Sequence, residues 1–153
     1  MANTYTQIHI HFVFAVKFRQ AIISNEWKDE LYKYIAGIIK SNNHKLLAIN
    51  GVADHIHILI GIRPAQSISE LMKHIKQDSS KWINNNNFLK IHFEWQEGYG
   101  AFSYSKSQLN AVVNYIQNQE LHHQKKTFRE EYINFLDKFE IDYDERFIFK
   151  ELI

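Results

Sequence analysis

The chain contains 153 residues, 45% apolar and 23% charged, a composition typical of a single globular domain spanning 1–153. The absence of cysteine excludes disulfides and thiolate metal sites and favours a reducing, cytoplasmic location. The alternating N-terminus is unlike a signal peptide, and no apolar segment is long enough to span a membrane, so we expect no membrane partner. Residues 130–153 carry 8 acidic and 3 basic side chains, whereas the rest of the chain has 15 basic and 9 acidic ones. The mildly basic body is compatible with a polyanionic partner.

Hydrophobic patterns predict the secondary structure. In YTQIHIHFVFAVKF every second residue from Ile8 to Phe18 is apolar, which indicates a long strand. Capping boxes at 67–70 and 105–108, and a similar TFRE at 127–130, mark three helix starts. The first predicted elements, in chain order, are a strand at 5–18, a helix from Ser24 to about 41, strands at 45–52 and 55–62, and a helix from 67 to the asparagines at 84–87. They are followed by a strand at 91–105 with a break at Gly98 and Gly100, a helix to about 123, and a short helix from 127.

This order predicts a ferredoxin-like α+β fold, in which a βαββαβ core forms an antiparallel sheet with helices on one face. The core sheet occupies about 4–105. A tyrosine-bearing helix at about 106–124 follows, and then a C-terminal helix with an acidic tail at about 127–153. In this topology the first and third strands are central, so the third strand, ADHIHILIG, lies in the middle of the sheet.

The third strand contains His55-Ile56-His57. Because side chains alternate along a strand, its isoleucines share one face and both histidines point to the other, away from the packed helices. Two imidazoles at i and i+2 are able to converge on one metal ion, which then needs a further ligand. The alternative is a half-exposed strand with ordinary polar histidines. A second pair, His9 and His11, lies on the first strand and gives no reason to propose a metal site there.

A candidate partner is the helix containing NYIQNQELHH. Tyr115 and Gln119 are four residues apart and therefore share a helical face, although a solvent-facing tyrosine is the simpler interpretation. Two imidazoles with an amide oxygen suit a divalent ion that binds substrate phosphate. A zinc hydrolase is a weaker alternative, because no HExxH is present. The chain also lacks a glycine-rich phosphate loop, so we expect no nucleotide cofactor.

The motifs DHIHIL, WQEGYGAFSYS and YIQNQELHH, in this order and spacing, resemble the single-tyrosine HUH transposases of small hairpin-ended bacterial insertion sequences. The resemblance implies that Tyr115 attacks a DNA phosphodiester to form a 5′-phosphotyrosine. It also implies that His55, His57 and Gln119 hold Mg²⁺ or Mn²⁺ on the scissile phosphate. The expected partners are single-stranded DNA with hairpins and a second copy of the chain in a homodimer.

Several further residues are candidates for the DNA interface or for support of the site. Lys17 and Arg19 match basic positions of the family, and Lys73 and Lys76 lie on an outward strip of the second helix, where they can contact phosphates. Asp54 either orients an imidazole or closes the hairpin turn. His122 and His123 recur in the family pattern without a role that spacing reveals.

Two other functions remain compatible with the sequence. One is a domesticated relative that acts on chromosomal repeat hairpins. The other is a non-catalytic module that binds single-stranded nucleic acid by stacking bases on its aromatic residues.

Overall fold

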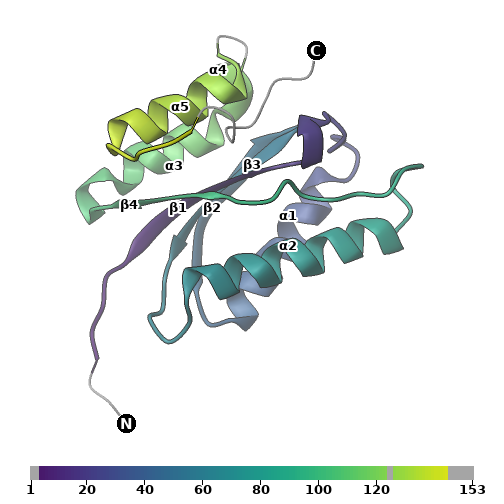
Figure 1. The fold of residues 1–153 in the computed structure, drawn as a ribbon. Coiled ribbons are helices and arrows are strands. Elements are labelled where there is room, and N and C mark those ends of the chain that lie inside the picture. The colour runs from purple at the N-terminus through teal and green to yellow at the C-terminus, as the bar shows by residue number, and fades with distance from the viewer. Residues whose placement is uncertain (1–3, 124–125, 145–153) are drawn as a thin grey trace.

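The computed structural model describes residues 4–123 and 126–144, and at residue 122 it describes the backbone alone (Figure 1). Residues 145–153 of the predicted acidic tail therefore lie outside the described residues. Four strands form one antiparallel sheet in the order β2-β3-β1-β4. The bounds of these strands are His9–Ala15 for β1, Lys45–Val52 for β2, His55–Gly61 for β3 and Gly100–Tyr104 for β4. With helices α1 (Lys28–Ser41) and α2 (Ile68–Asn85) between them, this order confirms the predicted α+β, ferredoxin-like fold.

Helices cover both faces of the sheet (Figure 1). On one face, α1 and α2 enclose the main core, which contains Phe12 and Phe14 of β1 together with Ile56, Ile58 and Ile60 of β3. On the other face lie α3 (Leu109–Gln117), α4 (Gln119–His123) and α5 (Phe128–Lys138), which pack against two smaller apolar clusters. The period-two alternation of β3 therefore separates its isoleucines from its histidines, as the sequence predicts.

The first and fourth strands are shorter than predicted. Beyond β1 the chain forms a short 3-10 turn, η1 (Lys17–Arg19), because Phe18 and Arg19 adopt positive φ angles of 59° and 52°. Before β4, Gly98 has a φ of 83°, which an extended strand does not accommodate. Residues 91–99 therefore approach β1 through a single bridge, Val16 to Trp95, rather than through a ladder.

The predicted tyrosine helix at about 106–124 is also interrupted. It begins with a 3-10 turn, η2 (Lys106–Gln108), whose capping box at Ser105 and Gln108 is present as predicted. Helix α3 ends at Gln117, and Asn118 then takes a φ of −102° and a ψ of 27° before α4 begins. A continuous helix is therefore replaced by two short ones. The predicted N-caps Ser67 and Thr127 do accept hydrogen bonds from Glu70 and Glu130.

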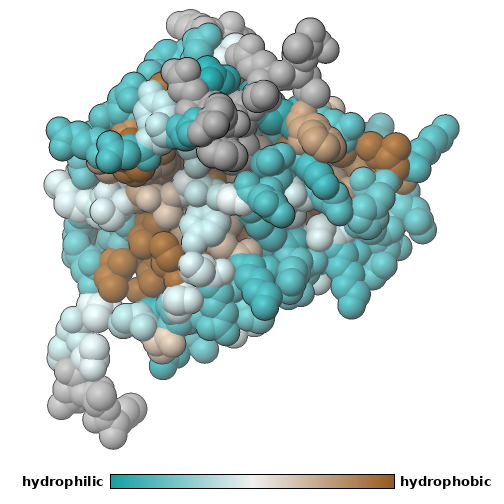
Figure 2. Space-filling view, in the orientation of Figure 1, coloured by the Kyte–Doolittle hydropathy of each residue, from teal (hydrophilic) through white to brown (hydrophobic). Residues whose placement is uncertain are grey.

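The described residues contain no helix that is both long and apolar enough to cross a membrane. Figure 2 shows that hydrophilic residues cover most of one face of the molecule, and that hydrophobic ones gather there in small, separate patches.

Candidate active site

The two histidines of β3 are completely buried. His55 and His57 face the side of the sheet that α3, α4 and α5 cover, and neither side chain has any exposed surface. The hairpin before β3 is tight at Gly51, where a Cβ atom would collide with the backbone of His55. The interpretation as half-exposed polar histidines is therefore wrong, because the C-terminal helices close over this face of the sheet.

A single carboxylate lies at the centre of the site. Oε1 of Glu131, on α5, is 3.0 Å from Nε2 of His57, 3.4 Å from Nε2 of His55 and 3.3 Å from Nε2 of His123. One ligand atom from each of these four residues lies within 4.8 Å of every other. The group has the residue types and the spacing of a metal site, with three imidazoles and one carboxylate.

The outer nitrogen of each imidazole is also held. Nδ1 of His55 is 2.7 Å from Oδ1 of Asp54, and the other oxygen of Asp54 pairs with Arg19 at 3.0 Å. Nδ1 of His57 shares a hydrogen bond of 2.8 Å with Nε2 of His11, which is itself buried. Such partners fix the orientation of ligand histidines in metal sites. Of the two predicted roles of Asp54, its contact supports the orienting one.

Tyr115 reaches the same carboxylate from α3. Its hydroxyl donates a hydrogen bond to Oε2 of Glu131, while Oε1 faces the imidazoles. Asn50 of β2 holds the end of α3 by donating from its side-chain amide to the carbonyls of Ile116 and Gln117, at 3.0 and 3.1 Å. The tyrosine is therefore fixed beside the histidine pair, which is the position that the resemblance to the HUH transposases implies.

Gln119 is fully buried at the start of α4. Its amide nitrogen donates to the carbonyl of Tyr115 at 3.3 Å and lies 3.5 Å from Oε2 of Glu131, and its amide oxygen is 3.1 Å from Nε2 of His123. The break at Asn118 therefore does not separate Gln119 from Tyr115. Both remain at the site.

The charges of these groups depend on one another. Burial lowers the pKa of His57 to about 4, against the opposing influence of Glu131, so this imidazole is neutral near pH 7. Burial also disfavours the charged form of His55, but the carboxylates of Asp54 and Glu131 outweigh it and raise the pKa. For Glu131, burial is outweighed by the imidazoles, which hold its pKa well below the usual range. Burial and the charge of Glu131 raise the pKa of Tyr115.

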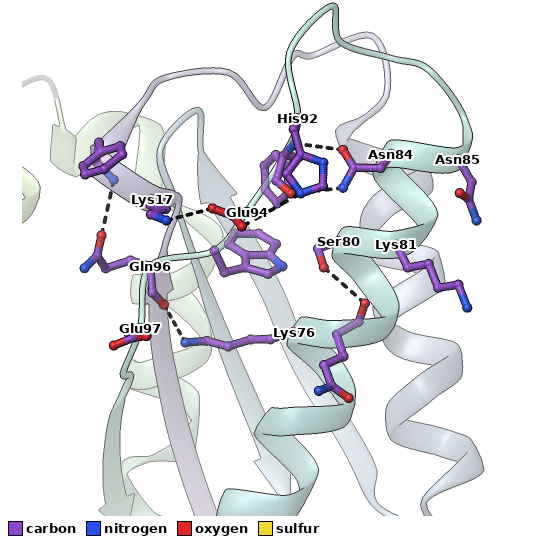
Figure 3. A pocket seen from close by; sticks show the side chains of 14 residues that line it. Lys17, Lys76, Ser80, Lys81, Asn84, Asn85, His92, Glu94, Gln96 and Glu97 are labelled. Atoms are coloured by element: carbon purple, nitrogen blue, oxygen red, sulfur yellow. Dashed lines mark hydrogen bonds and ion pairs between the residues drawn. The ribbon is translucent and has the colours of Figure 1, made fainter.

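The predicted DNA-contacting residues occupy different environments. Lys17 and Lys76 line one groove of about 970 Å³, next to the exposed ring of Phe18 (Figure 3). The Lys17 ammonium pairs with Glu94 at 2.8 Å, and Lys76 donates to the carbonyls of Gln96 and Gly98. The groove residues are Lys17, Phe18, Lys76, Gln77, Ser80, Lys81, Asn84, Asn85, His92, Phe93, Glu94, Trp95, Gln96 and Glu97.

The other two predicted cations are not in that group. Lys73 is exposed on α2 outside the groove lining. Arg19 is buried, paired with Asp54, and stacked over the ring of Phe128 at 4.9 Å. Arg19 supports the histidine site through Asp54, whose other oxygen contacts His55, and DNA contact by any of these four residues stays a prediction.

Three residues of the site were not predicted. His11 belongs to a second His-x-His that gives no reason to propose a metal site from the sequence, and spacing reveals no role for His123. Glu131 was absent from the predictions, although a signal exists: Phe128, Tyr132 and Leu136 repeat at helical spacing, and Glu131 lies on the same stripe. An acidic residue on the buried face of a helix indicates a partner of opposite charge or a metal.

Comparison with known proteins agrees with this geometry. A sequence model of the family described as "Transposase IS200 like" matches residues 4–119. The chain is 27% identical over 126 residues to the ISDra2 transposase TnpA of Deinococcus radiodurans, which covers 74% of this chain and 84% of that protein. It is 27% identical over 124 residues to the transposase of insertion sequence IS200 of Salmonella typhimurium, covering 78% and 81% of the two chains.

Two solved structures share the fold. A transposase from Deinococcus radiodurans superimposes with a TM-score of 0.64 at 23% identity, covering 78% of this chain and 95% of that one. A REP-associated tyrosine transposase bound to a REP hairpin superimposes with a TM-score of 0.61 at 15% identity, covering 80% and 73%. These two structures show that transposases share this fold, and the match of the family model shows that the chain is itself a transposase. The chain belongs to the IS200-like transposase family.

Proposed function

We propose that this chain cleaves and rejoins single-stranded DNA at the hairpin-marked ends of an insertion sequence, through a covalent 5′-phosphotyrosine at Tyr115. The observation that carries the proposal is that the Tyr115 hydroxyl and the two histidines of β3 contact the two oxygens of one carboxylate. A nucleophile placed next to a candidate metal site is the arrangement that phosphodiester attack by a tyrosine requires.

A divalent ion, Mg²⁺ or Mn²⁺, fits the residues. Nε2 of His55 is buried and makes no hydrogen bond within the described part of the chain, which leaves a nitrogen lone pair available to a cation. His55 and His57 supply two nitrogens, and the amide oxygen of Gln119 lies on the same side of the site. When bound, such an ion polarises the phosphate and stabilises the departing oxyanion.

The residues of the chain then have distinct tasks. The Tyr115 oxygen bonds to phosphorus, the bond from phosphorus to the 3′ oxygen breaks, and that oxygen takes a proton to become a 3′-hydroxyl. An unperturbed phenol has a pKa of about 10, so only about one part in a thousand is phenolate at pH 7. Burial and Glu131 raise the pKa of Tyr115 further. Attack therefore depends on a positive charge at the histidine site, which favours loss of the phenolic proton.

The groove between α2 and residues 92–97 is a candidate path for the DNA strand. Its lysines 17, 76 and 81 suit phosphates, and the ring of Phe18 is 67% exposed and suits a base. Lys73 and Arg19 are kept as weaker candidate contacts. As the resemblance implies, we propose that two copies act together as a homodimer on cytoplasmic DNA.

A second candidate function is action on chromosomal repeat hairpins. The observation in its favour is the likeness to a REP-associated tyrosine transposase whose structure contains a REP hairpin. Incubating the protein separately with an insertion-sequence end and with a repeat hairpin distinguishes the two functions. Only the DNA that contains the cognate hairpin should be cleaved beside that hairpin.

The test uses a single-stranded oligonucleotide with a hairpin end, incubated with the protein and Mn²⁺. A covalent adduct that survives denaturation should form, and EDTA should abolish it. Tyr115→Phe should form no adduct, whereas the matched control Tyr34→Phe, an exposed tyrosine on α1, should react like the wild type. An adduct of normal yield with Tyr115→Phe would falsify the assignment of the nucleophile.

A further inference from the structure

Glu131 and His123 lie outside the region that the family model matches, which ends at residue 119. Both belong to the C-terminal segment that closes over the sheet, Glu131 on α5 and His123 at the end of α4. Both nevertheless direct ligand atoms at the histidine pair of β3. The site therefore has a second half that the HUH motif does not supply.

The hydrogen-bond partners of His55 and His123 determine which of their ring nitrogens carry a proton. Nδ1 of His55 faces a carboxylate oxygen of Asp54, and Nδ1 of His123 faces the carbonyl of Lys126 at 3.0 Å. Both partners only accept, so each Nδ1 must carry the proton that is donated. In a neutral imidazole the other nitrogen then presents a lone pair, and both Nε2 atoms point at Oε1 of Glu131. Nε2 of His123 also lies 3.1 Å from the amide oxygen of Gln119, which likewise only accepts.

Lone pairs that converge on a carboxylate oxygen repel one another unless a cation lies among them. Oε1 of Glu131 also faces Nε2 of His57, so three imidazoles meet at an oxygen that has only two lone pairs. The nitrogen–oxygen distances of 3.0, 3.3 and 3.4 Å equal the separations of adjacent ligands on one ion. Ligand bonds of about 2.1 Å give separations of about 3.0 to 3.4 Å between octahedral or tetrahedral neighbours.

We propose that Glu131 and His123 are ligands of the same ion that His55 and His57 hold, so that three imidazoles and a carboxylate bind the metal beside the amide oxygen of Gln119. This inference rests on the proposed function, since it names two further residues and the metal class of that site. A nitrogen-rich site favours Mn²⁺ and later transition metals over Mg²⁺, whose preferred ligands are oxygens. The carboxylate also links the metal to the nucleophile, because its other oxygen accepts from Tyr115.

The first test measures metal affinity and not activity. Mn²⁺ is titrated into full-length protein and the free ion is followed by electron paramagnetic resonance. Glu131→Gln should bind Mn²⁺ at least about tenfold more weakly than the wild type, because losing even a supporting residue of a metal site costs about 10–100-fold. Glu130→Gln is the matched control, since Glu130 is the exposed neighbour on the same helical turn, and its affinity should not change.

The second test reads the ligands directly. Pulsed resonance of bound Mn²⁺ detects coordinated imidazole nitrogens, and the number should fall from three to two in His123→Gln. This count does not move if His123 only supports the fold, and it applies even if Glu131→Gln does not fold. Wild-type affinity in Glu131→Gln, or an unchanged nitrogen count in His123→Gln, overturns the proposal.

The two proposals fail in different ways. Tyr115→Phe should bind Mn²⁺ normally and lose the DNA adduct. If that adduct persists, the proposed function fails whatever the metal data show. If the adduct depends on Tyr115 but Glu131→Gln and His123→Gln bind Mn²⁺ as the wild type does, only the ligand assignment fails.

Discussion

The hydroxyl of Tyr115 donates a hydrogen bond to Glu131, 16 residues further along the chain and on a different helix. The other oxygen of Glu131 lies 3.0 Å from Nε2 of His57. One side chain of α5 therefore connects the candidate nucleophile on α3 with the histidine pair on β3. The C-terminal helix is part of the candidate active site and not merely a cover over the sheet.

Acidification should destabilise the metal-free protein. Burial lowers the pKa of His57 to about 4 from a usual 6.5, and that of His11 falls as well. Between these values the unfolded chain binds more protons than the folded one, so stability falls as the pH drops from about 6.5 toward about 4. The raised pKa of His55 acts at higher pH, because its stabilising contribution is already complete below the usual value of 6.5 and is lost only as the pH rises through the folded pKa.

Because the contribution of His55 is constant below pH 6.5 while those of His57 and His11 are lost there, we expect the Tm in EDTA to fall over this window. The lowered pKa of Glu131 adds to the fall below about pH 4.5, where the unfolded carboxyl takes up a proton that the folded one does not. Thermal unfolding at several pH values measures the slope, and His57→Gln should make it shallower. A wild-type Tm that is level or rising as the pH falls from 6.5 to 4 contradicts the assigned charge states.

Asp54→Asn should weaken both the fold and the metal site. It leaves the guanidinium of Arg19, whose side chain is only 9% exposed, without its carboxylate partner, at a cost of about 3 kcal/mol, the low end for a buried pair. It also removes the acceptor that orients His55, which should reduce Mn²⁺ affinity about 10–100-fold. Denaturant unfolding and metal titration measure the two effects.

Glu94→Gln is the matched control for that experiment, because it breaks a pair with Lys17 that is open to solvent. Exposed ion pairs contribute little to stability, so neither stability nor Mn²⁺ affinity should change appreciably. Equal losses in both variants would mean that Asp54 has no special role at the site.

Lysines of the groove should contribute to the salt dependence of DNA binding. If Lys17 and Lys81 each contact a phosphate, the double change Lys17→Gln with Lys81→Gln should flatten the plot of log K against log salt by about 1.4, at about 0.7 per contact on single strands. Fluorescence anisotropy with a labelled single strand measures the slope. The double change Lys33→Gln with Lys40→Gln, on exposed positions of α1, should leave it unaltered; the same slope in all three proteins argues against the groove.

Local sequence patterns predict the fold and part of the candidate site, namely the two histidines of β3 together with Tyr115 and Gln119. The alternation of ADHIHILIG placed the isoleucines of β3 in the core and its histidines on the opposite face, and strand order followed from the sequence of elements. Motif spacing brought Tyr115 and Gln119 to the same place. These features depend on neighbours in the sequence, which patterns record.

The remainder depends on long-range packing. The contacts of His11 with His57 and of Arg19 with Asp54 join residues 46 and 35 positions apart, and nothing local specifies them. The positive φ angles that shorten β1 occur at Phe18 and Arg19, residue types that rarely signal a turn. Glu131 is the clearest omission, because its role appears only when α5 is placed over the sheet.

The most direct measurement of the central claim locates the DNA on the protein. The adduct formed with Mn²⁺ is digested with trypsin and nuclease and examined by mass spectrometry. The tryptic peptide 107–125 contains a single tyrosine, Tyr115, so its assignment is unambiguous. We predict that this peptide carries a nucleotide through its 5′ phosphate. A nucleotide on any other peptide, or cleaved DNA with no protein-linked nucleotide, contradicts the account.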